Sequence, residues 1–100
     1  MNNYLVRVIL HGKHYDHSDY NLLFSAMKRA GYSNLIKGEA KEGQTEVWKL
    51  PAGEYHICSP DGILSVRQDV KVIANSADPN NAVFVTDYFR AAWDGLKTVG

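Results

Sequence analysis

The sequence predicts an α+β domain with the element order strand, helix, strand, strand, helix, strand, followed by a short C-terminal helix. Three observations lead to this prediction. A β-branched run with alternating side chains lies near the start, two later segments carry apolar residues at helical spacing, and turns with glycine or proline separate several short strand-like segments. With 45% apolar residues, a chain of 100 residues can bury a core without disulfides or metals. We therefore assign residues 1–100 to one domain.

The first strand is predicted over Tyr4–Leu10, because its residues are mostly β-branched or aliphatic and alternate between two faces. Arg7 interrupts the apolar run and marks the face that we expect to be wetter. The polar segment His11–His17, which contains Gly12, is predicted to be a loop.

A helix is predicted next, over about Tyr20–Ala30, with Asp16, Ser18 or Asp19 as its N-cap. Apolar side chains recur there at spacings of three and four, which is typical of a helix with one buried face. Gly31 supplies the stop.

Two strands are predicted in the middle of the chain. The first covers Leu35–Ala40 and ends in a turn at Lys41–Gln44; the second covers Glu54–Cys58, after a Pro-Ala-Gly break. The intervening segment Glu46–Leu50, which contains Trp48, extends a hairpin or connects the strands, and its placement stays open.

The second helix is predicted to begin at Ser59-Pro60-Asp61, which resembles an N-cap followed by proline at the first helical position. Ile63, Val66, Val70 and Ile73 follow a helical spacing, and this spacing favours a helix over the strand that several β-branched residues would otherwise suggest.

A last strand is predicted at Ala82–Thr86, and Asp87 is predicted to cap a C-terminal helix. The apolar face of that helix would consist of Phe89, Ala92, Trp93 and Leu96.

Two β-α-β units with right-handed crossovers give a ferredoxin-like sandwich. We therefore expect a four-stranded antiparallel sheet with two helices on one face, plus the short C-terminal helix.

The charge balance argues against a protein that holds duplex nucleic acid non-specifically, because 11 basic and 11 acidic residues give no net charge. Cys58, the only cysteine, lies in a strand-like run and is predicted to be a buried, reduced thiol. The apolar run at the start is too short to cross a membrane and contains Arg7, so we expect a cytoplasmic protein without membrane contacts.

Three histidines at a spacing of three, His11, His14 and His17, lie beside Asp16 and Asp19 in the first loop. Imidazoles with carboxylates are typical of transition-metal sites and of acid–base centres. A solvated loop that has no chemical role is the third and simplest interpretation. We assign neither a metal nor a cofactor.

Arg7, Lys28 and Arg29 are the candidate phosphate contacts. Three further residues around the predicted hairpin, Trp48, Tyr55 and His56, suit base stacking, although core packing or a dimer contact would explain them as well.

The C-terminal run Val83–Arg90 (Val-Phe-Val-Thr-Asp-Tyr-Phe-Arg) resembles the final strand and helix start of the GhoS family of endoribonuclease antitoxins. The helix Tyr20–Gly31 with the Tyr-Ser that follows it, and the segment Leu50–Tyr55, are similar as well. This resemblance implies a fold like that of small CRISPR-associated endonucleases, and cleavage of the message of a membrane-lytic toxin. It also implicates a basic residue late in the first helix. Lys28, with Arg29 adjacent, stands at that place instead of arginine.

These observations lead to the hypothesis of a homodimeric, metal-independent RNA-binding or RNA-cleaving protein, with a toxin mRNA as the implied target. His14 or His17 would transfer the proton, and Lys28, Arg29 or Arg7 would contact the phosphate.

The alternative is a non-catalytic homodimeric module that buries an apolar sheet face. That face would contain Leu5 and Ile9, with Tyr55 or Ile57.

Overall fold

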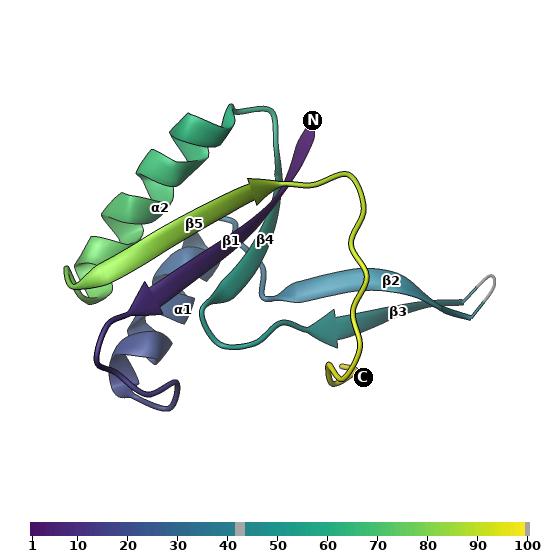
Figure 1. Ribbon diagram of the computed structural model, residues 1–100, viewed down its shortest axis with the longest axis horizontal. Helices are drawn as coiled ribbons and strands as arrows, with labels where there is room; N and C mark the ends of the chain where they lie inside the picture. Colours follow the sequence, from purple (N-terminus) through teal and green to yellow (C-terminus); the bar gives the residue numbers. More distant parts are fainter. Residues whose placement is uncertain (42–43, 100) are drawn as a thin grey trace.

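Two helices cover one face of a three-stranded sheet, and a two-stranded hairpin projects from the edge of this body (Figure 1). The computed structural model describes residues 1–41 and 44–99. The chain is therefore α+β, but the predicted four-stranded sheet is wrong. The strands of the chain form one sheet of three and a separate sheet of two. The projecting hairpin makes the molecule elongated, with extents of 43 × 31 × 20 Å.

The main sheet has β1 (Asn2–Leu10) at its centre, between β4 (Glu54–Ser59) and β5 (Asn81–Asp87). Both neighbours run antiparallel to β1. The central position follows from the sequence, because β1 has the longest apolar alternation in the chain and buries its even-numbered residues from Tyr4 to Leu10 almost completely.

The hairpin consists of β2 (Leu35–Lys41) and β3 (Gln44–Lys49). β2 does not become a fourth strand beside β4; Ser33, which precedes β2, forms an isolated bridge in which its backbone exchanges two hydrogen bonds with His56 (2.9 and 2.7 Å). β2 begins at Leu35, two residues after Ser33, and runs antiparallel to β4. β4 begins at Glu54, only two residues before His56. β2 therefore extends past the beginning of β4, and it pairs with β3 instead. The Trp48 segment, which the sequence left open, is the second strand of this hairpin.

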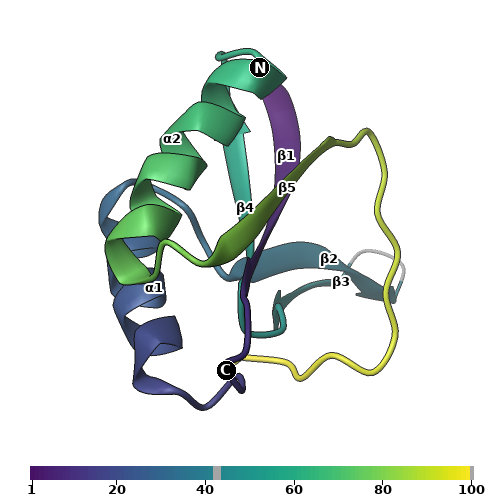
Figure 2. The same ribbon diagram turned by 60° about the vertical axis from the view of Figure 1, so that its left-hand side comes forward.

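The two helices are α1 (Ser18–Arg29) and α2 (Ile63–Ala77). Both lie on the same face of the main sheet, as Figure 2 shows. The prediction of a helix rather than a strand for the stripe Ile63–Ile73 is confirmed, but its predicted start is wrong: the N-cap is Gly62, and Ser59 and Pro60 precede the helix. Their apolar stripes meet the even-numbered side chains of β1 in one core. Its most buried members are Tyr4, Val6, Val8, Leu10, Leu23, Met27, Val66, Val70 and Ala74.

The N-cap of α1 is His17, not Asp16, Ser18 or Asp19. Its Nδ1 accepts a hydrogen bond from the Asp19 backbone amide at 3.0 Å, and its backbone is extended as a cap requires. An imidazole nitrogen can replace the usual cap oxygen, because the free amide needs only an acceptor.

The tail, residues 88–99, is not the predicted helix. It leaves β5 and runs to the hairpin, where the Lys49 amide donates to the Lys97 carbonyl (3.0 Å) and the Val99 amide donates to the Val47 carbonyl (2.9 Å). Gly95 adopts a φ of 82°, which interrupts helical geometry. Backbone hydrogen bonds to β3 replace those of a helix. The prediction was wrong because it used only the spacing of the apolar residues.

Cys58 is exposed on β4, and the prediction that it is buried is wrong. Its side chain points to the sheet face that carries no helix, and its Sγ lies 3.7 Å from the Met1 Sδ.

Across residues 1–41 and 44–99, no helix combines the length and the apolar character needed to span a membrane.

Candidate nucleic-acid interface

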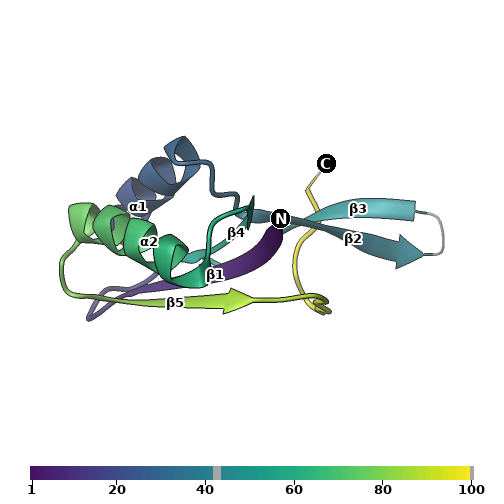
Figure 3. The same cartoon turned by 90° about the horizontal axis from the view of Figure 1, so that it is seen from above.

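The face of the main sheet that is turned away from the helices, called the open face below, lies bare over much of its area in Figure 3. Alternation along β1 places Leu5, Arg7 and Ile9 there. Arg7 lies opposite Phe84 of β5 and Glu54 of β4. Phe84 is 67% exposed, so the open face offers a cation beside an aromatic ring.

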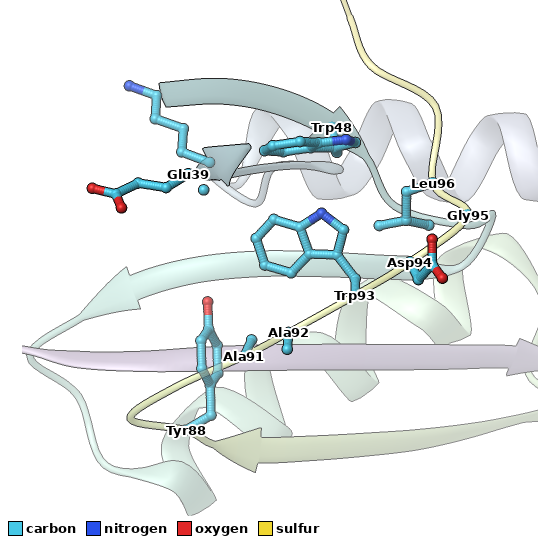
Figure 4. Close-up of a pocket in the computed structure, with 11 residues that line it drawn as sticks. Glu39, Trp48, Tyr88, Ala91, Ala92, Trp93, Asp94, Gly95 and Leu96 are labelled. Atoms are coloured by element: carbon cyan, nitrogen blue, oxygen red, sulfur yellow. The ribbon is translucent and has the colours of Figure 1, made fainter. Parts of the chain in front are cut away.

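A groove of about 590 Å³ lies between the tail and the hairpin. Three aromatic side chains line it: Trp48 from β3, and Tyr88 and Trp93 from the tail. Lys37 of β2 adds an ammonium group. Figure 4 shows the Trp93 ring between the tail and Trp48, with the Tyr88 ring standing at the other end of the groove. The groove is open, and its aromatic surfaces come from segments that lie 40 residues apart in the chain.

The aromatic rings of the groove are held edge to face. Trp48 and Trp93 have ring centroids 5.3 Å apart at 70°, and Tyr88 lies 5.8 Å from the ring of His56 at 61°. Such pairs fix the ring planes while leaving a face of a ring able to accept a further planar group. The His56 contact also connects the groove to the open face, because His56 projects from β4 on that side.

Burial shifts two ionisable groups at this junction toward their neutral forms. It lowers the pKa of His56 below its usual value and raises the pKa of the Tyr88 hydroxyl above its usual value. Both side chains are therefore neutral at pH 7. The groove can stack planar rings and hydrogen-bond through a neutral hydroxyl, while Lys37 supplies a positive charge.

Two carboxylates, Glu39 and Asp94, line the same groove and offset the charge of Lys37. A polyanion would therefore gain little from this groove by charge neutralisation. The arrangement suits a ligand that is held mainly through its ring faces.

The histidines predicted for proton transfer have separate surroundings. His14 is 79% exposed, and its Nδ1 lies 2.7 Å from the Asp16 Oδ1. His17 is the N-cap of α1, and its side chain accepts a hydrogen bond from the Asp19 backbone amide. His11 lies in the turn after β1, where its backbone amide donates to the Asn80 carbonyl at 2.9 Å.

The cations predicted for phosphate contacts are divided between two places. Lys28 and Arg29 are exposed in the last turn of α1, with the Lys28 Nζ 6.0 Å from the centroid of the Phe24 ring. At about 1.5 Å per residue, the length of α1 separates them from His17 by about 16 Å. Arg7 lies on the other side of the sheet. The structure therefore does not bring His14 or His17 together with any of the three cations.

Of the three predicted stacking residues, Trp48 lines the groove, and His56 only contacts Tyr88, which lines it; Tyr55 does neither. Tyr55 is 3% exposed and belongs to the core, where burial raises its pKa to about 12. The sequence missed Tyr88 and Trp93 as site residues, because it assigned them to a helix. Gly95, a poor helix former inside the predicted helix, is the signal that could have argued against that helix.

Among the residues that the structure describes, no three His, Cys, Asp or Glu side chains are grouped to hold a metal ion. Comparisons with family models, curated proteins and solved structures find no match to this chain.

Proposed function

We propose that this protein binds single-stranded RNA in the groove between the tail and the hairpin. One observation carries the proposal: Trp48, Trp93 and Tyr88 line a single open groove together with Lys37. Stacking of bases on aromatic side chains is the usual means of holding a single strand, and it tolerates many sequences because every base has a ring face.

A single strand fits this arrangement better than a duplex. The bases of a duplex are stacked on each other and do not present their faces, whereas unpaired bases can enter a groove lined by rings. The chain also has no net charge, and Glu39 and Asp94 border the groove. Binding is therefore expected to depend only weakly on salt.

The open face offers a continuation of the binding surface. Tyr88 contacts His56 at the groove, and Arg7 lies on the same face of the sheet. A strand whose bases stack in the groove can place a phosphate near the Arg7 guanidinium, which suits phosphate through its planar set of donors.

The proposal is for binding rather than cleavage. Proton transfer to and from a sugar hydroxyl needs a base within hydrogen-bond reach, and a cation near the same phosphate. His14 and His17 lie at one end of α1, and Lys28 and Arg29 lie at the other. The resemblance to the GhoS antitoxins supports RNA as the ligand class, with a toxin message as one target to include.

The test is titration of the protein with an oligouridine of about ten nucleotides, within the usual site size of small single-strand binders. Stacking on Trp48 or Trp93 should quench tryptophan fluorescence. Replacing Tyr88→Leu should weaken Kd by about 5- to 150-fold, which corresponds to about 1–3 kcal/mol for one stacked base. Tyr88→Phe should retain most of the affinity.

Tyr15→Leu is the matched control, because Tyr15 is an exposed tyrosine in the loop before α1 and does not line this groove. Equal affinity of wild type and Tyr88→Leu, or tighter binding of a matched duplex than of the single strand, would contradict the proposal.

A further inference from the structure

The outer edge of β5, on the side away from β1, pairs with no other strand in the part of the chain that the structure describes. β5 pairs with β1 over seven consecutive residues without a register shift, and it is the last strand on its side of the sheet. Natural edge strands are usually protected by lysine, proline or a bulge. The β5 sequence Asn-Ala-Val-Phe-Val-Thr-Asp contains neither lysine nor proline.

The backbone groups that point outward from β5 can be identified from its flanking hydrogen bonds. The Tyr88 amide donates to the Asn3 carbonyl, and the His11 amide donates to the Asn80 carbonyl. The odd-numbered residues of β1 therefore face β5, and the even-numbered residues of β5 face β1. Since these groups alternate in an antiparallel pair, Val83 and Val85 direct their amides and carbonyls outward.

We propose that β5 pairs antiparallel with β5 of a second copy, about a two-fold axis at Phe84, to form a homodimer. In this register Val83 of each copy lies opposite Val85 of the other, and the two pairs exchange about four backbone hydrogen bonds. The two three-stranded sheets become one continuous sheet. The inference goes beyond the proposed RNA binding and does not depend on it.

The self-complementary sequence of β5 favours a second copy over an unrelated strand. The two Phe84 residues face each other across the axis as a non-hydrogen-bonded pair, the arrangement in which cross-strand side chains lie closest. Each Phe84 is 67% exposed in the single chain, so pairing covers apolar surface that is otherwise in water.

The charges at the ends of the strand are also complementary. Asn81 lies opposite Asp87 of the second copy in this register, and Asp87 is the only charged residue of β5. Lys71 of α2 already extends to this place, with its Nζ 2.6 Å from the Asn81 Oδ1 and 3.4 Å from the Asn81 carbonyl. Asn81 and Asp87 project to the same side of the sheet as α2, because both alternate with Phe84. Each Lys71 therefore meets an Asp87 carboxylate, and no like charges face each other.

Disulfide trapping tests the register. In a Cys58→Ser background, Phe84→Cys should give a covalent dimer under mild oxidation, because the two substituted positions face each other across the axis. Thr86→Cys is the matched control on the same strand and the same face. In the proposed register, residue 86 of one copy lies four residues, about 13 Å along the strands, from residue 86 of the other copy. This distance exceeds the reach of a disulfide. Equal trapping of both variants, or trapping of Thr86→Cys alone, would overturn the proposal.

Light scattering at micromolar concentration tests the oligomer itself. The wild type should have the mass of two chains, and Phe84→Lys should have the mass of one, because it sets two ammonium groups against each other. Val72→Lys, which changes a 60% exposed residue on α2, should remain dimeric. A monomeric wild type, or a dimeric Phe84→Lys with an unchanged circular dichroism spectrum, would overturn the inference.

The RNA titration separates the two proposals. Each copy contains its own groove, so monomeric Phe84→Lys should still bind oligouridine. A wild type that binds RNA as a monomer overturns only the dimer, and a dimer that does not bind RNA overturns only the proposed function.

Discussion

Gly38 lies directly against the Trp93 indole, and a Cβ placed on this glycine would come within 2.6 Å of two ring carbons. The absence of a side chain at position 38 therefore allows the tail to pack on the hairpin. The same contact sets one wall of the groove, since Trp93 in turn packs on Trp48. A single glycine in β2 thus connects the hairpin, the tail and the candidate RNA site.

Replacing Gly38→Ala should displace Trp93 and loosen the tail. The added methyl group meets a rigid ring, and such overpacking typically costs about 1–3 kcal/mol. We expect the cost to fall on the attachment of the tail, because the atoms nearest to a Cβ at this position belong to Trp93 of the tail and Trp48 of β3. Limited proteolysis should then cut within residues 88–99, and tryptophan emission should shift to the red. Gly62→Ala is the control, since nothing lies within 4 Å of a Cβ there. Equal protease resistance of both variants would contradict the role of Gly38.

Replacing His17→Ala should lower the free energy of unfolding by about 0.5–1 kcal/mol, as expected for the loss of an N-cap acceptor. His17→Asn should recover most of this loss, because its side-chain oxygen can accept the same bond from Asp19. Urea denaturation of the three proteins measures the effect. His14→Ala, in the same loop but 79% exposed, should have little influence on stability. If His17 instead served in proton transfer, His17→Ala would unfold like the wild type while RNA cleavage was lost.

The protein should lose stability as the pH falls below about 6.5, in part because of His56. Burial lowers the pKa of His56 in the folded protein, so the unfolded chain binds a proton that the folded chain resists. The unfolded state is therefore favoured progressively from about pH 6.5 down to the folded pKa. Thermal unfolding between pH 8 and pH 5 should show a smaller decline for His56→Phe than for the wild type. His14→Gln, which leaves His56 in place, should keep the wild-type difference. An unchanged decline in His56→Phe would show that other groups account for it.

Removing the Arg7 charge should flatten the salt dependence of RNA binding. One phosphate contact to a single strand contributes about 0.7 to the slope of log K against log salt, so Arg7→Gln should reduce the slope by about that amount. The affinity at low salt should fall while tryptophan quenching at saturation stays the same, because Arg7 does not line the groove. Arg67→Gln removes an exposed charge from α2, on the other side of the sheet, and should leave the slope unchanged. A reduced slope in both variants would indicate non-specific attraction instead.

The sequence alone determined the elements whose patterns reflect burial on one side. The alternation along Tyr4–Leu10 identified β1, and the helical stripes through Leu23 and Val66 identified α1 and α2, because each buries one face against the same core. It also placed Arg7 correctly on the face without helices. These features depend on local periodicity, which a single segment carries by itself.

Only the tertiary structure decided where the remaining segments pair. β2 extends past the beginning of β4 and pairs with β3, and the apolar residues of the tail pack on the hairpin instead of forming a helical stripe. Both outcomes depend on strand lengths and on contacts between residues far apart in the chain, such as Gly38 with Trp93. The candidate site depends on the same strand lengths and long-range contacts. Trp48 and Trp93 belong to one groove only because the tail returns to β3, which no local pattern encodes.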